Sequence, residues 1–114
     1  MILREIVELL QAEVICENGQ LDKTVKHVFA ADLMSDVLRL DTSEMLLITG
    51  LTNLQVIRTA EMSDIQFIIF VRNKPIAPEM VELAKESNIC LIQCKQSMFK
   101  TCGELYVAGL KPVY

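Results

Sequence analysis

The stretch LLITGLTNLQVIRTAEM, residues 46–62, combines the two patterns from which we predict the fold. It opens as a continuous apolar run, breaks at Gly50, and resumes with apolar residues at helical spacing. A buried strand, a glycine turn and an amphipathic helix form the unit that many α/β proteins repeat. In such proteins the turn after the strand can bind a phosphate group, or it can simply redirect the chain. The sequence leaves both roles open for Gly50.

The same strand–helix unit recurs twice more toward the C-terminus. We predict strands in MLLIT, IQFIIFV and ICLIQ, followed by helices over residues 53–63, 78–87 and 98–108. Nearly continuous apolar strands are typical of a parallel sheet that helices cover on both faces. Earlier in the chain we expect a helix over residues 2–11, strands in AEVICE and VKHVFAA, and a short helix capped by Asp32. The fold class that follows is α/β, a single-domain three-layer sandwich with a mostly parallel sheet over residues 1–114.

The composition of the 114-residue chain limits which kinds of partner and which cellular location we expect. Hydrophobic residues make up 52% of it, which is high for one small domain, so we expect part of the apolar surface to be buried in a homodimer. The formal net charge is −4 and no run of Lys or Arg could follow a nucleic-acid backbone, which argues against nucleic acid as a partner. No apolar run approaches the roughly 20 residues that span a bilayer, and charged residues interrupt the N-terminal apolar pattern. We therefore expect a cytoplasmic protein that does not contact a membrane.

The residue types that most often carry chemistry form no recognisable catalytic or metal-binding pattern. The four cysteines include no Cys-x-x-Cys pair, and His27 is the single histidine. We therefore expect core thiols, no metal and no cofactor, with Cys94 as the one candidate for a reactive thiolate because it ends a strand beside Lys95. Phosphoryl transfer needs a phosphate cradle and metal ligands, and neither glycine-rich phosphate-binding motif is present. The sequence predicts a protein that is not an enzyme.

A candidate ligand site follows from the predicted topology. Ligands of parallel sheets usually bind beyond the carboxyl ends of the strands, where helix N-termini and loop cations favour an anion. We expect this edge to bind a small phosphate-bearing metabolite or nucleotide through Asp32, Gly50, Thr52, Asn53, Arg72 and Lys95. The alternative is structural: Thr52-x-x-Gln55 matches a capping box, and Gly50 would supply a positive φ.

Three segments, ADLMSDVLRL (31–40), LLITGLTNLQVIRTAEMSDIQFIIFVRNKPIAPEMVELAKESNICLI (46–92) and CGELYVAGL (102–110), resemble the DRTGG domain family. The resemblance implies an α/β fold and a role in regulation and subunit association. Such domains resemble the N-terminal domain of HPr kinase/phosphorylase and occur beside CBS domains in some pyrophosphatases. The chain departs from the family pattern at one place: the literal Asp-Arg-Thr-Gly-Gly string is absent, and Thr49-Gly50-Leu51-Thr52-Asn53 stands there.

The residues and the resemblance together predict a non-catalytic regulatory or ligand-sensing module that forms a homodimer. Two alternatives come from the resemblance to stand-alone members, which are described as HPr serine kinases and in some cases are encoded among iron hydrogenase genes. The first is an accessory protein that docks on a redox enzyme of the hydrogenase type through protein contacts. The second is a kinase-associated subunit. The P-loop of HPr kinase/phosphorylase lies in its C-terminal domain, so the resemblance does not extend kinase activity to this chain.

Overall fold

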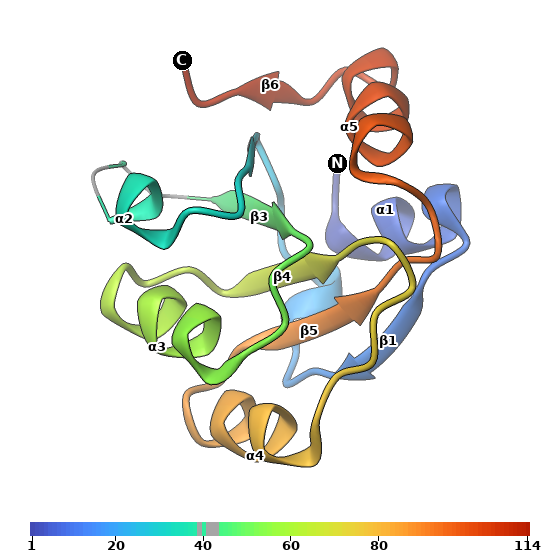
Figure 1. Ribbon diagram of the computed structural model, residues 1–114. Coiled ribbons are helices and arrows are strands. Elements are labelled where there is room, and N and C mark those ends of the chain that lie inside the picture. Colours follow the sequence, from blue (N-terminus) through green and yellow to red (C-terminus); the bar gives the residue numbers. More distant parts are fainter. Residues whose placement is uncertain (39, 41–43) are drawn as a thin grey trace.

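The computed structural model describes residues 1–38, 40 and 44–114, and within them six strands form one sheet in the order β1-β5-β4-β3-β2-β6 (Figure 1). The strands are β1 (Glu13–Cys16), β2 (His27–Ala30), β3 (Met45–Thr49), β4 (Phe67–Phe70), β5 (Cys90–Gln93) and β6 (Lys111–Pro112). Strand β1 runs antiparallel to β5, and every other neighbouring pair is parallel. The mostly parallel sheet predicted from the sequence is confirmed.

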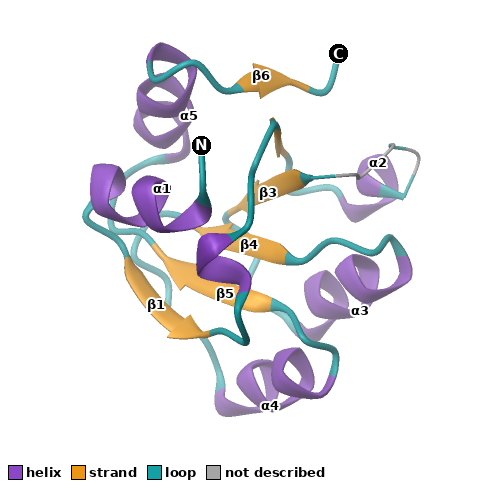
Figure 2. Cartoon of the chain, turned by 180° about the vertical axis from the view of Figure 1, so that it is seen from behind, coloured by secondary structure: helices purple, strands orange, loops and turns teal. Residues whose placement is uncertain are grey.

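Helices cover both faces of the sheet, as Figures 1 and 2 show from opposite sides. One face carries α1 (Leu3–Leu10) and α5 (Met98–Val107), and the other carries α2 (Met34–Val37), α3 (Leu54–Met62) and α4 (Pro78–Glu86). A short 3₁₀-helix, η1 (Gln20–Asp22), connects β1 to β2. The predicted helices over residues 53–63, 78–87 and 98–108 correspond to α3, α4 and α5 with ends that differ by at most one residue. Each helix in the described residues falls short of the length and apolar character needed to span a bilayer.

The core consists of two apolar layers separated by the sheet. Successive side chains of a strand point to opposite faces. In β3, Leu46 and Ile48 pack with α1 and α5, whereas Met45 and Leu47 pack with α2, α3 and α4. All four side chains are at most 1% exposed. A central strand that is buried on both faces must be apolar at every position, which explains the continuous apolar runs and confirms the three-layer architecture.

Local chemistry at the helix N-termini determines where three of the helices begin. Asn53 Oδ1 accepts a hydrogen bond from the Val56 N–H at 3.2 Å, and Ser97 Oγ accepts one from the Lys100 N–H at 3.1 Å. These side chains cap α3 and α5. Pro78 lies in the first turn of α4, where its missing N–H leaves no hydrogen bond unmade.

Two helix caps predicted from the sequence are wrong. The N-cap of α3 is Asn53, so Thr52 and Gln55 do not form the expected capping box. The N-cap of α2 is Leu33, and no side chain caps this helix. Asp32, which we expected to cap α2, instead accepts hydrogen bonds from the loop that follows β3. Its carboxylate therefore connects two strands of the sheet rather than starting a helix.

The cysteines are free thiols, and three of them, Cys16, Cys90 and Cys94, are buried. Burial raises the pKa of the Cys90 thiol to about 12. Cys94 has no exposed surface, and its Sγ lies 3.7 Å from the Thr101 hydroxyl. Burial argues against the reactive thiolate predicted at Cys94, because a reagent or substrate in solvent cannot reach its sulfur.

Candidate functional site

The carboxyl ends of β2, β3, β4 and β5 meet at one edge of the sheet (Figure 1). In the strand register, Ala30 is paired with Ile48, Thr49 with Phe70, and Phe70 with Gln93. The four loops that follow these strands therefore begin side by side. The six residues predicted to bind a ligand lie on these loops, at the edge where the topology places ligands in other open α/β sheets.

Asp32 connects three of these loops through its carboxylate. Its Oδ1 accepts hydrogen bonds from the Gly50 N–H at 2.8 Å and from the Thr49 hydroxyl at 3.1 Å. Its Oδ2 lies 3.2 Å from Nη2 of Arg72, with which it forms an ion pair. The structure thus brings together Asp32, Gly50 and Arg72 from the predicted site and adds Thr49, which the sequence analysis had treated as a strand residue.

The pKa of the Asp32 carboxyl is lowered from its ordinary value. The Gly50 N–H contributes most, the Arg72 guanidinium and the Thr49 hydroxyl act in the same direction, and partial burial opposes them. The Arg72 and Asp32 side chains are 42% and 48% exposed, so solvent screens their attraction. The geometry holds the carboxylate charged and oriented, and a backbone donor is the largest single cause.

Gly50 makes room for the Arg72 guanidinium. A Cβ atom added at Gly50 would overlap Nη2 and Cζ of Arg72. The glycines with positive φ are Gly19 and Gly109, so the positive φ expected at Gly50 is wrong. Gly50 is therefore required for the close approach of a side chain, because any larger residue would push Arg72 away from Asp32.

The backbone of the loop after β4 orients Arg72. Arg72 and Asn73 have φ values of 67° and 53°, which are uncommon for residues other than glycine. The Arg72 N–H donates to the Gln96 carbonyl at 2.8 Å, and the Asn73 N–H donates to the Cys94 carbonyl at 3.0 Å. A conformation of this kind persists when its surroundings hold it in place. Here the loop after β5 does so and thereby directs Arg72 toward Asp32.

Gln96, on the loop after β5, has a side-chain oxygen without a hydrogen-bond donor among the described residues. Its side-chain Oε1 is buried and accepts no hydrogen bond within the described part of the chain. The nearby Gln93 amide, by contrast, donates to the Lys74 carbonyl at 2.6 Å. Because buried amide oxygens normally accept a hydrogen bond, Gln96 Oε1 is available to a donor from water or from a ligand. The sequence offered no signal for this residue, since burial of a loop amide depends on tertiary packing.

The other predicted site residues lie at the same edge but outside the Asp32 network. Thr52 is half-buried, and Asn53 uses its Oδ1 to cap α3. Lys95 is exposed and takes part in none of the ion pairs formed among residues 1–38, 40 and 44–114. Lys95 therefore remains a flanking cation, and Asn53 has a structural task that accounts for its presence.

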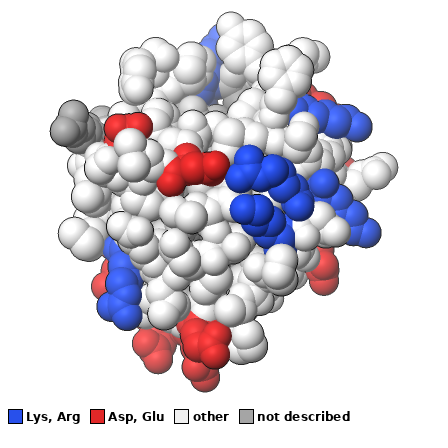
Figure 3. Space-filling model, viewed as in Figure 1, with Lys and Arg blue, Asp and Glu red and all other residues white. Residues whose placement is uncertain are grey.

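Basic side chains gather beyond the carboxyl ends of β3, β4 and β5, next to an acidic one (Figure 3). The loops after β4 and β5 and the first turn of α5 carry the cations Arg72, Lys74, Lys95 and Lys100. This local excess of positive charge is opposite in sign to the net charge of the whole chain, which is −4. Positive potential over a helix N-terminus favours an anionic ligand at this edge.

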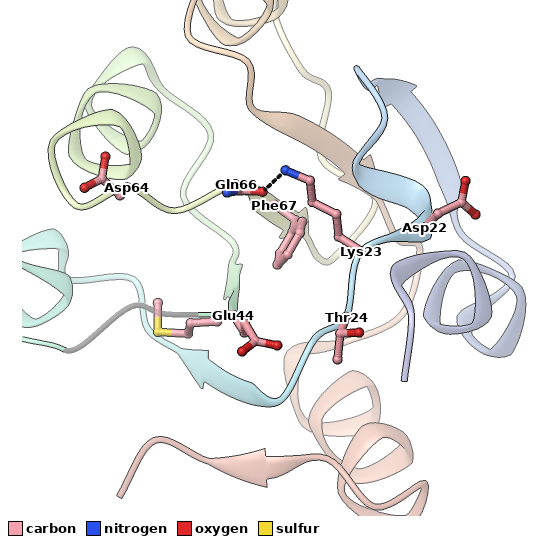
Figure 4. Close-up of a pocket in the computed structure, with 8 residues that line it drawn as sticks. Asp22, Lys23, Thr24, Glu44, Asp64, Gln66 and Phe67 are labelled. Atoms are coloured by element: carbon pink, nitrogen blue, oxygen red, sulfur yellow. Dashed lines mark hydrogen bonds between the residues drawn. The ribbon is translucent and has the colours of Figure 1, made fainter.

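The opposite edge of the sheet holds a pocket of about 690 Å³, for which the sequence gives no signal (Figure 4). It is lined by Asp22, Lys23, Thr24, Glu44, Met45, Asp64, Gln66 and Phe67. Lys23 Nζ donates to Gln66 Oε1 at 2.8 Å, and Asp22 and Asp64 lie at opposite ends of the pocket. Within the described residues no three or more His, Cys, Asp or Glu side chains converge closely enough to hold a metal ion. Three carboxylates make this pocket less suitable for an anion than the Arg72 edge.

Comparisons with known proteins agree with the fold. The DRTGG domain family matches residues 5–106 of the 114-residue chain. A similar solved structure contains the CBS and DRTGG domains of the regulatory region of Clostridium perfringens pyrophosphatase, complexed with the activator diadenosine tetraphosphate. The TM-score is 0.76 at 20% sequence identity, and the match covers 97% of this chain and 47% of that chain. The chain thus spans about half of its structural neighbour, and at this identity the likeness shows the fold alone. No curated protein matches the sequence.

Proposed function

The chain belongs to the DRTGG domain family, and on that premise we propose that it is a non-catalytic regulatory module that binds a small anionic ligand at the carboxyl edge of its sheet. The observation that carries the proposal is the position of Arg72, which is held over Gly50 by a left-handed backbone and remains 42% exposed. A guanidinium has five N–H donors in a planar fork that suits phosphate oxygens. Contact with Asp32 leaves part of that fork facing solvent.

Asp32 occupies the place that an anionic group would take in this site. A backbone N–H, a hydroxyl and a guanidinium form the kind of donor set that binds phosphate, and here the Asp32 carboxylate accepts from all three. We propose that Asp32 holds these donors in place until a ligand arrives. The incoming phosphate would then share Arg72 with Asp32 or displace Asp32 from it, so Asp32 competes with the ligand.

The structural neighbour supports a nucleotide as the ligand class. The regulatory region of that pyrophosphatase was solved with a dinucleoside tetraphosphate, which carries several phosphate groups and two amino-bearing bases. This chain corresponds to 47% of that one, so the complex does not by itself assign the activator to the matching half. A nucleotide would nevertheless suit both features of this edge, because phosphate could contact Arg72 and a base amino group could donate to Gln96 Oε1.

We propose no reaction for the chain. Phosphoryl transfer requires a phosphate cradle, a metal-binding group and a positioned base, and the Asp32 carboxylate that connects the loops of this edge is already bonded to Arg72. We further propose that the protein acts as a homodimer in the cytoplasm. The apolar fraction of 52% supports the dimer, and the free thiols agree with a reducing compartment.

A thermal-shift screen tests the ligand site. We expect diadenosine tetraphosphate, ATP or another phosphate-bearing metabolite to raise the melting temperature, because a ligand at 100 times its Kd stabilises the folded state by about 2.7 kcal/mol. Arg72→Ala should remove this shift while leaving the unliganded melting temperature nearly unchanged. Arg58→Ala is the matched control, since Arg58 is an exposed arginine on α3 outside this edge.

Two outcomes would contradict the proposal. The first is that no phosphate-bearing compound in the screen raises the wild-type melting temperature. The second is that Arg72→Ala responds to the same compound as strongly as Arg58→Ala does. In either case Arg72 and Asp32 would form a structural contact between loops, and Gly50 would serve that contact alone.

A further inference from the structure

Helix α5 carries apolar side chains on two opposite faces. Its inner face packs on the sheet through Leu105, which is 1% exposed, and through the fully buried Thr101. Its outer face presents Phe99, Tyr106 and Val107, which are 89%, 71% and 88% exposed. A helix that is apolar on all sides is normally buried on all sides. The chain itself covers the inner face of α5 and leaves the outer face open.

The outer residues of α5 form one continuous stripe. Phe99, Gly103, Tyr106 and Val107 follow the i, i+4, i+7, i+8 spacing of a single helix face. A Cβ atom added at Gly103 would meet nothing within 4 Å, so packing inside the chain does not require glycine there. Glycine weakens a helix interior, but it allows a second helix to approach closely. Gly103 therefore leaves room in the middle of the stripe for the close approach of a helix from outside this chain.

The stripe continues into an apolar hollow beside it. A pocket of about 160 Å³ lies between α5 and β2, and its lining is apolar except for Lys111. The apolar part comprises Cys102, Leu105 and Tyr106 of α5 together with Val28, Ala30, Leu110 and Pro112. At this end of the molecule, where Figure 1 places α5 and β6, Figure 3 shows uncharged side chains with basic and acidic ones beside them. We use the name α5 surface for the stripe, formed by Phe99, Gly103, Tyr106 and Val107, together with this adjoining pocket.

We infer that the α5 surface binds a second copy of the chain, with the two α5 helices antiparallel about a two-fold axis near Cys102. The inference deepens the homodimer named in the proposed function by assigning its interface. In this arrangement Phe99 faces the partner's Tyr106, and Lys100 faces the partner's Glu104. A two-fold interface must be complementary to itself, and both pairings meet that requirement.

The charges favour a second copy over an unrelated partner. Lys100 and Glu104 lie one turn apart on the same flank of the stripe and have opposite charges. A two-fold axis midway between them places each lysine opposite a glutamate of the other chain. An unrelated partner would need a matching pair of its own, whereas a second copy supplies it without further assumptions.

The apolar area is of the size that a dimer interface uses. An aromatic side chain buries about 150–250 Å² when it is covered. Phe99 and Tyr106, at 89% and 71% exposure, therefore offer roughly 250–400 Å² per copy, up to half of the roughly 800 Å² per partner in a standard interface. Val107 and the adjoining pocket add to it.

Light scattering at tens of micromolar protein tests the inference directly. The wild-type chain should give twice the monomer mass of 12.9 kDa. The double variant Phe99→Ala/Tyr106→Ala should give the monomer mass with an intact fold, because both side chains are exposed in the single chain. Met62→Ala is the matched control, since Met62 is 73% exposed but lies on α3, and it should remain dimeric.

Charge reversal tests the antiparallel arrangement. Lys100→Glu and Glu104→Lys should each weaken the dimer at least tenfold, because each places like charges opposite one another. An equimolar mixture of the two variants should form a heterodimer of near wild-type affinity, since every opposed pair is then complementary. Sedimentation equilibrium at a series of concentrations measures all three dissociation constants.

A monomeric wild-type chain would overturn the inference, and so would a Phe99→Ala/Tyr106→Ala variant that dimerises as tightly as Met62→Ala. Failure of the mixed charge variants to associate would overturn the antiparallel pairing. Phe99 and Tyr106 are not among the residues proposed to bind the ligand, so the thermal shift of the Phe99→Ala/Tyr106→Ala variant reports on the Arg72 site independently of its mass. Failure of the interface and failure of the ligand site are therefore distinguishable.

Discussion

The guanidinium of Arg72 lies over Gly50, with Nη2 placed 3.2 Å from Oδ2 of Asp32. Asp32 and Arg72 are 40 residues apart and follow two strands, β2 and β4, that are not adjacent in the sheet, because β3 lies between them. The contact therefore crosses the loop after β3 and connects three loops at once. Substitutions at this edge separate the structural roles of these residues from a role in binding.

Gly50→Ala should expel Arg72 from Asp32 without disturbing the fold. The new methyl group would occupy the space of a flexible side-chain end, which can move away into solvent. Loss of an exposed ion pair costs at most about 1 kcal/mol, and the substitution of glycine offsets part of that cost. We expect urea unfolding to show a change within about 1 kcal/mol.

The matched test for Gly50 is the same change in an Arg72→Ala background. With no guanidinium to displace, Gly50→Ala should have no destabilising effect there, and the double-mutant cycle should show coupling between the two positions. A loss of several kcal/mol in that background would mean that Gly50 is required for a reason other than the approach of Arg72.

Asp32→Asn should weaken the dependence of stability on acid pH. The pKa of Asp32 is lowered in the folded state, so the unfolded chain binds more protons and stability rises with pH. The contribution is present above the ordinary carboxyl pKa of about 4 and is lost as pH falls through the lower folded value. The melting temperature of the wild type should exceed that of Asp32→Asn at pH 7, and the difference should shrink below about pH 4.

Arg72→Ala provides the control for this pH effect. Because the Gly50 N–H is the largest single cause of the lowered pKa of Asp32 and does not depend on Arg72, removal of Arg72 should leave part of the acid dependence in place. If Arg72→Ala and Asp32→Asn flatten the profile equally, the ion pair rather than the backbone donor dominates the titration of Asp32.

Asp32→Asn should also strengthen the binding of a phosphate-bearing ligand. An asparagine removes the negative charge that competes for Arg72, and it keeps an oxygen that can accept from the Gly50 N–H. We expect calorimetric titration of the compound found in the thermal-shift screen to give a several-fold lower Kd. A higher Kd would show that Asp32 contacts the ligand directly, as a carboxylate on a ribose hydroxyl would.

Asn53→Ala should destabilise the protein more than Thr52→Ala does. Asn53 Oδ1 caps α3 through the Val56 N–H, and loss of such a cap costs about 1 kcal/mol. Thr52 precedes the cap, so its truncation should cost less than Asn53→Ala in chemical unfolding. The reverse order of the two variants would support the capping box that the sequence suggested and would contradict the cap seen in the structure.

The layered architecture follows from patterns that are local in the sequence. Continuous apolar runs such as those of β3, β4 and β5 can be buried only between two helical layers, and the period of apolar residues marked α3, α4 and α5 to within one residue at each end. These signals are local, because burial of a strand or of one helix face imposes its own period on consecutive residues. The loops that would share the carboxyl edge followed from the parallel topology alone.

The roles of the residues at that edge, by contrast, depend on contacts between segments that are far apart in the chain. Asp32 matches the sequence pattern of a helix cap, yet it accepts hydrogen bonds from Gly50 and Arg72, which are 18 and 40 residues away. Gly50 matches the pattern of a turn, yet its missing side chain leaves room for the Arg72 guanidinium. The apolar stripe of α5 can likewise be identified as exposed only because the structure shows that the opposite face of this helix packs on the sheet. Side-chain partners of this kind depend on the order of strands in the sheet and on the direction of each loop, and no periodicity within one segment encodes either.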